Sequence, residues 1–286
     1  MTTPRMSSAD TVDPGRPFTD DPVRAAAERL GRAAATGIPC PPVRDLIGSS
    51  DIRAAYRVQS VLTAERLAAG GHRIGRKIGL TSTAVQKQLG VGQPDFGVLF
   101  DDMRLGGGDV ISMGRLLQPK VEAEVAFLLA EDLMSGPLDA RSVRPAIAYA
   151  VAAIEVVDSR VAGWDITLGD TVADNASSGL FVLGPQRRTL DQVEPAGVSM
   201  TMTVDGELVS SGDGRACLGD PLNALVWLAN TAIELGDPLR AGEVILSGAL
   251  GPMYPVRPGS VVRADISGLG SVSARFSHDL LPEEGR

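Results

Sequence analysis

The sequence predicts an α+β protein in which a small N-terminal helical part precedes a larger, mainly β domain with a few helices. Two helical patterns occupy residues 22–35 and 51–69. From Arg73 onward, short apolar runs are separated by Gly, Pro and Asp, which is typical of strand-rich domains. The chain has 286 residues, of which 44% are hydrophobic and 4% aromatic, so it is long enough for one large domain with a small appendage.

Three regions are predicted along the chain. Residues 1–20 are rich in Thr, Pro, Ser and Asp and are expected to form a disordered tail, neither a signal peptide nor a membrane anchor. Residues 21–72 form the helical region, in which Asp20-Asp21-Pro22 caps the first helix and Gly70-Gly71 ends the second. We interpret these two helices as a lid or an interface layer. Residues 73–280 form the third, strand-rich region.

The strand-rich region is predicted to contain one sheet with a few helices. The other elements are a helix from Ser82 to about Leu89, a loop over 92–97, a helix over 140–149, and a helix that begins at Asp220-Pro221 and ends at Gly236. A hairpin is expected about the turn Asp205-Gly206. The predicted strands cover 73–80, 98–100, 109–112, 121–129, the run around Glu155, 179–183, 198–204, 207–211, 243–246, 261–266 and 271–276, and the last three close the sheet.

Composition and charge exclude several classes of function. The net charge of -8 and the pI of about 4.9 argue against a nucleic-acid-binding surface, and no apolar run reaches the length of a membrane span. Cys40 and Cys217 are the only cysteines, which fits a reducing cytosol, and neither His72 nor His278 lies in a zinc or triad pattern. We therefore expect a cytoplasmic protein whose partners are small molecules or copies of itself, with no nucleic acid and no membrane.

Residues 118–129 carry the pattern around which we build the predicted site. Apolar residues there alternate with Lys120, Glu122 and Glu124, so the two carboxylates point to the same side of a strand. Like charges on one face of a strand repel each other, and a cation between them removes that conflict. The alternative is a solvent-facing strand with charged side chains.

A third glutamate favours the cation. Glu155 interrupts an apolar run over 152–157 that predicts a buried strand, and a buried carboxylate requires a partner or a metal. Three Glu oxygens from two strands suit a hard divalent ion such as Mg²⁺ or Mn²⁺ and leave about half of an octahedron open for water and substrate. Glu122, Glu124 and Glu155 are therefore the predicted metal ligands.

Four further places are candidates for chemistry, and each has an ordinary alternative. Lys77 is either a solvated lysine or, beside a metal, a donor that stabilises a developing enolate. Asp95 is either a turn residue or a general acid or base on a loop. Ser178 either follows a plain polar turn or presents its hydroxyl to a ligand. Residues 247–252 are either a common Gly-rich turn or the backbone-lined edge of a pocket.

Seven stretches between residues 22 and 277 carry a resemblance to a known family. They are KIGLT at 77–81, VQKQLGVG at 85–92, QPDFG at 93–97, QPKVEAE at 118–124, EVVDSR at 155–160, VADNAS at 172–177 and GALGPM at 248–253. In this order, they resemble the 2-keto-4-pentenoate hydratases of the fumarylacetoacetate hydrolase superfamily. The resemblance implies a mixed β-roll with flanking helices and a small N-terminal helical part, in which 73–280 is a metal-dependent catalytic domain.

The resemblance also implies a set of site residues and a cofactor, Mg²⁺ or Mn²⁺. These residues are Glu122, Glu124 and Glu155 for the metal, Lys77 and Asp95 for catalysis, and Leu80, Ser178, Gly248 and Pro252 for the substrate. The implied reaction is the addition of water to 2-hydroxypenta-2,4-dienoate, which gives 4-hydroxy-2-oxopentanoate in the meta-cleavage catabolism of aromatic or related ring compounds.

Three alternatives accompany the hydratase interpretation. 4-Oxalocrotonate decarboxylases share the metal strands, but an apolar residue replaces the Asp of their Pro-Asp-Phe-Gly motif and their Gly-Ala-Leu-Gly-Pro loop differs, so Asp95 favours a hydratase. Hydratases of this family form homo-oligomers and can associate with the decarboxylase. A non-catalytic partner subunit is thus the second alternative, although the intact acidic and basic residues argue against it. Carbon–carbon bond hydrolases of the superfamily use a His-Glu pair on a lid helix, and 82–89 contains no His.

Overall fold

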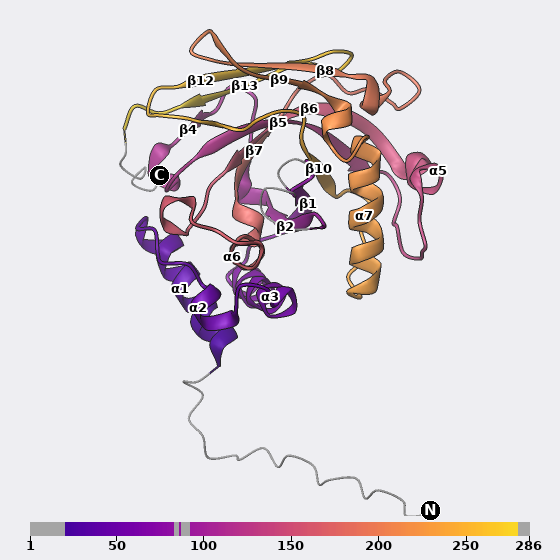
Figure 1. Cartoon of the computed structure of the whole chain (residues 1–286). Helices are drawn as coiled ribbons and strands as arrows, with labels where there is room; N and C mark the ends of the chain where they lie inside the picture. Colours follow the sequence, from indigo (N-terminus) through magenta and orange to yellow (C-terminus); the bar gives the residue numbers. More distant parts are fainter. Residues whose placement is uncertain (1–20, 83–85, 87–91, 280–286) are drawn as a thin grey trace, which may run out of the picture.

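Two curled β-sheets pack on each other and are flanked by helices (Figure 1). The computed structural model describes residues 21–82, 86 and 92–279. The α+β prediction is confirmed for this part of the chain. The tail predicted for 1–20 and most of the helix predicted for 82–89 lie outside the described residues. None of the described helices has the length and apolar character that a membrane span requires.

The N-terminal helices form where their capping residues predict them. Helix α1, Pro22–Thr36, begins at Asp21, whose side chain accepts a hydrogen bond from the Val23 N–H. Helix α3, Ile52–Ala68, is capped in the same way by Asp51. The four-residue α2, Arg44–Ile47, was not predicted. Together with α6, Leu168–Ala173, these helices enclose a small apolar core of their own beneath the larger sheet (Figure 1).

The larger sheet has eight strands and contains the strand pair predicted to hold the metal. Its order is β2-β1-β10-β5-β6-β7-β3, and β11 pairs with β5. Strands β1 and β10 run parallel, whereas β5 and β6 are antiparallel. The bounds are β1 Arg73–Gly79, β2 Asp95–Phe100, β3 Arg104–Leu105, β5 Lys120–Leu129, β6 Ile147–Val157, β7 Ser178–Leu183, β10 Val244–Ala249 and β11 Tyr254–Pro255.

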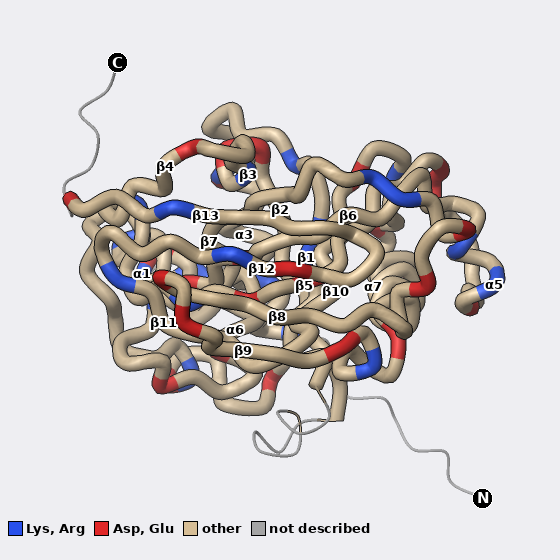
Figure 2. Tube along the Cα trace, turned by 90° about the horizontal axis from the view of Figure 1, so that it is seen from above, with Lys and Arg blue, Asp and Glu red and all other residues tan. Residues whose placement is uncertain are grey.

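A second sheet of five strands covers one side of the molecule in the order β4-β13-β12-β8-β9. Figure 2 looks onto this sheet and shows basic and acidic residues interspersed around it. The bounds are β4 Val110–Ile111, β8 Ser199–Val204, β9 Glu207–Asp213, β12 Val261–Ile266 and β13 Gly270–Phe276. The predicted hairpin forms between β8 and β9, and its turn residues Asp205 and Gly206 both have positive φ, 55° and 86°.

The prediction that the last three strands close one sheet is wrong. The first of them, β10, lies inside the eight-stranded sheet, whereas β12 and β13 belong to the five-stranded sheet. Their burial explains the separation. Five of the six residues of β10 are buried in an unbroken run, as in a strand covered on both faces, but β12 alternates exposed and buried residues.

The prediction of a helix over 140–149 is also wrong, because the helix is much shorter. Helix α5 covers only Ala140–Val143, a single 3-10 turn follows, and β6 begins at Ile147. Pro145 lacks an N–H and cannot continue the helical hydrogen-bonding pattern, and the next residues favour a strand. By contrast, helix α7, Pro221–Glu234, forms as predicted and packs against β10.

Gly75 lies at a close contact between β1 and β10, where it pairs with Val244. A Cβ atom at Gly75 would lie 1.9 Å from the Val244 carbonyl oxygen, so Gly75→Ala must separate two central strands. We expect it to lower the free energy of unfolding by about 3 kcal/mol, as measured by urea denaturation. Gly197→Ala is the matched control, because a Cβ there meets nothing within 4 Å. Equal unfolding midpoints for the two variants would contradict this prediction.

Candidate active site

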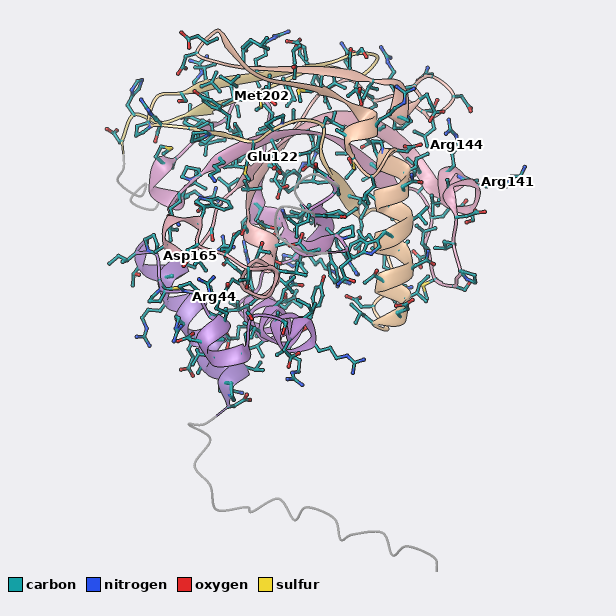
Figure 3. The ribbon with its side chains drawn as sticks, in the orientation of Figure 1. Arg44, Glu122, Arg141, Arg144, Asp165 and Met202 are labelled. Carbon is teal, nitrogen blue, oxygen red and sulfur yellow. The ribbon has the colours of Figure 1, made fainter. Side chains whose placement is uncertain are left out.

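The three glutamates predicted as metal ligands lie together on β5 and β6. Glu122 pairs directly with Glu155 across the two strands, and Glu124 lies two residues further along the same face of β5. One carboxylate oxygen from each residue lies within 4.8 Å of the other two. Figure 3 labels Glu122 near the centre of the molecule, beside the curved strand β5.

Several oxygens of these three carboxylates have no hydrogen-bond donor among the described residues. Glu124 is fully buried, Glu155 is 1% exposed, and Glu122 is partly buried. No group in the described part of the chain donates a hydrogen bond to Glu124 Oε1 or to either oxygen of Glu155. Burial and the charge of Glu155 raise the pKa of Glu122 to about 7, and burial followed by the charges of Glu155 and Glu122 also raises the pKa of Glu124. This cluster of unpaired oxygens fits a hard divalent cation, which would supply the missing positive charge.

Lys77 is buried beside the same cluster. Its Nζ lies 3.3 Å from Glu155 Oε1, and the residue is 3% exposed, so the alternative of a solvated lysine is wrong. Burial lowers the pKa of Lys77, but the nearby carboxylates, Glu155 first and Asp95 second, outweigh it and hold that pKa above its ordinary value. Lys77 therefore remains a cationic donor at neutral pH.

Asp95 faces the same region from a strand and not from a loop, which corrects the sequence interpretation. It is the first residue of β2 and pairs with Gly79 of β1. The preceding Pro94 suggested a turn, but proline is also tolerated next to the first residue of a strand. A Cβ at Gly79 would lie 2.2 Å from Asp95 Oδ1, so glycine at this position makes room for the carboxylate.

The Asp95 side chain is 2% exposed, and its Oδ1 accepts no hydrogen bond from the part of the chain that the structure describes. Burial raises the pKa of Asp95, the cation of Lys77 opposes this shift, and Glu155 adds to it, so that the pKa lies above its usual range. A buried carboxyl group with a raised pKa and a free oxygen is suited to proton transfer.

A cavity of about 280 Å³ connects these groups. Lys77, Asp95 and Glu122 form its charged wall, and Thr167, Thr171 and Ser177 bring hydroxyl groups. The remaining lining residues are Gly79, Leu80, Lys120, Val157, Trp164, Ile166, Ala176 and Met253. The structure thus places Lys77, Asp95 and Glu122 on one small cavity, and the other two predicted metal ligands, Glu124 and Glu155, lie buried beside Glu122.

The four residues predicted to contact the substrate do not all line the cavity. Leu80 lines the cavity. Ser178 does not, because its hydroxyl donates to the Asn175 carbonyl oxygen at 2.7 Å, and its neighbour Ser177 lines the cavity instead. The Gly248 N–H donates to Glu124 Oε2 at 2.8 Å, so it orients a predicted metal ligand. Pro252 is exposed, and the next residue, Met253, reaches the cavity.

Lys120 and Trp164 are two of the cavity residues that were not predicted to be functional. The Lys120 ammonium group lies 4.2 Å from the centroid of the Trp164 ring, a distance typical of a cation–π contact. Lys120 lies in the alternating strand pattern, but nothing in the sequence indicates that Trp164, the last residue of a 3-10 turn over Ala162–Trp164, would face it.

Comparison with known proteins assigns the family. Residues 75–277 match the family model described as fumarylacetoacetate (FAA) hydrolase C-terminal. The chain belongs to the fumarylacetoacetate hydrolase family. It is 52% identical over 272 residues to the TodF product hydratase of Pseudomonas putida F1, covering 95% of this chain and 99% of the relative. It is 51% identical over 253 residues to 2-keto-4-pentenoate hydratase 2 of Dechloromonas aromatica RCB, covering 88% and 97%.

A solved structure of the fumarylacetoacetate hydrolase family superposes on most of the chain. It is 4-oxalocrotonate decarboxylase from Pseudomonas putida G7, complexed with magnesium and adipate. The TM-score is 0.86 at 34% identity, and the match covers 92% of this chain and 100% of the decarboxylase. The two relatives are named as hydratases and the solved structure as a 4-oxalocrotonate decarboxylase, the two activities that the resemblance distinguishes by the residue at position 95.

One wall of the cavity in this family member is a strained turn. Asn175, Ala176 and Ser177 follow one another with φ values of 53°, 52° and 53°. The left-handed region costs a residue other than glycine about 1–2 kcal/mol, so other contacts must hold the turn. The Asn175 side chain accepts from the Val98 N–H at 2.7 Å and donates to the Val98 carbonyl oxygen at 2.9 Å. The buried carboxylate of Asp174, the residue directly before Asn175, binds the Arg160 guanidinium at 2.5 Å.

Asn175→Ala should release this turn. It leaves both backbone groups of Val98 without a partner, and we expect the free energy of unfolding to fall by about 3 kcal/mol, as measured by thermal denaturation. Ala176→Gly is the control, because glycine adopts positive φ without strain, and it should keep or raise stability. An unchanged melting temperature in Asn175→Ala would show that the side chain of Asn175 does not hold the turn.

Proposed function

We propose that this protein is a 2-keto-4-pentenoate hydratase, which adds water to 2-hydroxypenta-2,4-dienoate to give 4-hydroxy-2-oxopentanoate. The observation that carries the proposal is the buried Asp95 carboxyl group, which lines the same cavity as Lys77 and Glu122, beside the buried Glu124 and Glu155. The names of relatives at 51–52% identity along nearly their whole length support the same activity.

Glu122, Glu124 and Glu155 would hold the divalent metal, Mg²⁺ or Mn²⁺. Their unpaired oxygens fit such an ion, and the decarboxylase neighbour was solved with magnesium. When bound, the ion supplies Lewis-acid polarisation of the 2-oxo acid group of the substrate. The Gly248 N–H contributes by fixing Glu124 Oε2, which leaves Glu124 Oε1 free for the ion.

Asp95 moves the protons in this mechanism. The substrate first gains a proton at C5 while its 2-hydroxyl group loses one, which gives an α,β-unsaturated ketone. The raised pKa of Asp95 keeps a fraction of the carboxyl group protonated, so that it can deliver the proton to C5. The resulting carboxylate then accepts a proton from the water that attacks C4.

Lys77 stabilises the charge that this attack creates. Addition of water at C4 places negative charge on the 2-oxygen as an enolate, and protonation at C3 completes the product. The Lys77 ammonium group is fixed by Glu155 and lies at the cavity wall, so it can donate a hydrogen bond to the enolate oxygen. Because Lys77 is buried, little water competes for that hydrogen bond.

The size and lining of the cavity support a small substrate. A volume of about 280 Å³ holds a five-carbon acid together with the attacking water. Leu80, Val157 and Ile166 provide an apolar surface for the hydrocarbon end of the dienoate. Ser177 and Thr171 offer hydroxyl groups on the same wall as Asp95, where the attacking water must bind.

The second candidate is a 4-oxalocrotonate decarboxylase, which the structural match at 34% identity favours. A decarboxylase would release carbon dioxide and needs no group that activates water, so Asp95 would have no role in it. A third candidate is a non-catalytic subunit that associates with such a decarboxylase. For the hydratase itself we propose a homo-oligomer, as in the family that the sequence resembles.

One assay separates these candidates. The purified chain with Mg²⁺ or Mn²⁺ is mixed with 2-hydroxypenta-2,4-dienoate or with 4-oxalocrotonate, and both ultraviolet absorbance and carbon dioxide release are followed. A hydratase consumes the dienoate without gas release and stops when EDTA removes the metal. Carbon dioxide from 4-oxalocrotonate alone would assign the decarboxylase, and no turnover of either compound would assign the non-catalytic subunit.

A further inference from the structure

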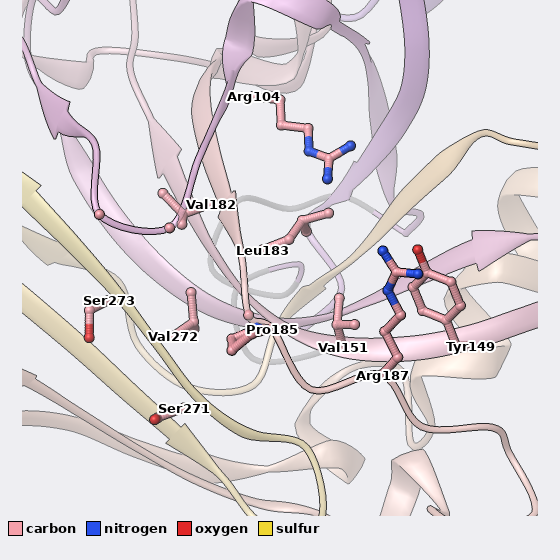
Figure 4. A pocket seen from close by; sticks show the side chains of 13 residues that line it. Arg104, Tyr149, Val151, Val182, Leu183, Pro185, Arg187, Ser271, Val272 and Ser273 are labelled. Atoms are coloured by element: carbon pink, nitrogen blue, oxygen red, sulfur yellow. The ribbon is translucent and has the colours of Figure 1, made fainter.

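A second cavity, of about 520 Å³, lies apart from the candidate active site (Figure 4). It shares no lining residue with the catalytic cavity. Tyr149 and Val151 of β6 line it, together with the end of β7, the segment that follows it, and Ser271 to Ser273 of β13. Tyr149 lies six residues before Glu155 on β6, which corresponds to about 20 Å along an extended strand. The two cavities are therefore separate sites.

The charged side chains of this second cavity are both arginines. Arg104 and Arg187 line it, and no Asp or Glu does. Among the described residues, neither guanidinium group forms an ion pair or donates a side-chain hydrogen bond. Elsewhere Arg44, Arg73 and Arg263 each bind a carboxylate at 2.5–2.7 Å. In a chain with 35 acidic and 27 basic residues, two arginines without a carboxylate at one cavity indicate a place for an external anion.

The tyrosine ring orients one of the two guanidinium groups. Arg187 Cζ lies 4.7 Å from the centroid of the Tyr149 ring. Figure 4 shows the Arg187 guanidinium group against this ring and the Arg104 side chain reaching toward the same side of the cavity. Stacking of this kind fixes the plane of a guanidinium group and leaves its N–H edges available to a carboxylate or phosphate.

The rest of the cavity is suited to an organic body and not to a bare ion. Tyr149, Leu183 and Pro185 contribute apolar surface, and Ser271 and Ser273 contribute hydroxyl donors. The volume falls in the range of about 300–1,000 Å³ that small-molecule sites occupy. An inorganic ion would leave most of this space and all of the apolar surface unused.

We propose that this cavity binds a small organic anion, a carboxylate or a phosphate ester with an apolar body, whose charged group contacts Arg104 and Arg187. The apolar body would lie on the surface of Tyr149, Leu183 and Pro185. The site requires no metal and none of the residues of the proposed hydratase mechanism, so its test is independent of that proposal.

Phenyl phosphate is the probe, because it joins a dianion to an apolar ring. It is titrated into the full, metal-free chain and followed by calorimetry. Neither arginine lines the catalytic cavity, so weaker binding in Arg104→Gln and Arg187→Gln assigns the bound probe to the second cavity. We expect saturable binding that weakens about tenfold in Arg104→Gln and again in Arg187→Gln, since each removes a charge-assisted hydrogen bond.

Two controls accompany the titration. Arg141→Gln removes an exposed arginine outside the cavity and should bind phenyl phosphate as the unchanged chain does. Benzyl alcohol, which keeps the ring without the charge, should not bind. Equal affinity in all variants, or no saturable binding in the unchanged chain, would overturn the proposal. A subunit number that changes in Arg104→Gln or Arg187→Gln would also overturn it, because a second copy of the chain would then occupy the cavity.

Discussion

Turnover of the dienoate is expected to fall by about a thousandfold in Glu124→Gln, because losing one of three anionic ligands removes several kcal/mol of metal-dependent stabilisation. The substitution keeps the shape of the side chain, and its amide oxygen can still accept from the Gly248 N–H. It removes the negative charge of a fully buried residue, so Mg²⁺ affinity measured by calorimetry should fall together with turnover.

The metal-free variant should nevertheless fold normally. Burial and two neighbouring carboxylates raise the pKa of Glu124, which means that its charge destabilises the folded chain without metal. We therefore expect a melting temperature that is unchanged or higher without metal, and a smaller increase on adding Mg²⁺. Glu131→Gln, at an exposed glutamate just after β5, is the matched control and should behave as the unchanged chain. Full turnover in Glu124→Gln would remove Glu124 from the metal site.

Asp95→Asn is expected to bind Mg²⁺ as tightly as the unchanged chain and to lose turnover by about 10²- to 10⁴-fold, the range for removing a general acid or base. Asn occupies the same space next to Gly79 but cannot exchange a proton. Initial rates from dienoate absorbance, measured across pH, should also lose the ionisation that the raised pKa of Asp95 contributes.

Asp191→Asn is the matched control, because Asp191 is exposed and does not line the cavity. It should keep full turnover at every pH. Unchanged turnover in Asp95→Asn would assign Asp95 a purely structural role at the start of β2, and a loss of Mg²⁺ binding would mean that Asp95 supports the metal site instead.

The sequence predicts those parts of the fold in which local patterns decide the structure. Capping residues such as Asp21 and Asp51 set the starts of their helices to within one residue. The hairpin at Asp205-Gly206 forms because this pair readily adopts positive φ. The sequence did not predict which of the two sheets each strand joins. Strands β10 and β12 differ in what covers their faces and not in local strand propensity.

In the candidate site too, local sequence patterns predict some features and miss others. The spacing of Glu122 and Glu124 and the isolated acid at Glu155 sufficed to predict that the three side chains converge, because strand periodicity determines their direction. Ser178 was predicted in place of Ser177. Three consecutive residues here have left-handed φ values, so the residue pattern does not indicate which side chain faces the cavity. Trp164 reaches the cavity because of the path of the segment that carries it. Packing sets that path, and no local sequence pattern predicts it.

The parallel pairing of β1 with β10 has a consequence for synthesis. Gly75 and Lys77 pair with Val244 and Leu246 of β10, so the strand that bears Lys77 leaves the ribosome long before its neighbour exists. At translation speeds of about 5–20 residues per second, that interval lasts roughly 10 to 30 seconds. Throughout it, this edge of β1 has no partner strand in the nascent chain, and chaperones have time to bind it. Catalytic competence therefore arises late, only after residues near the C-terminus have emerged.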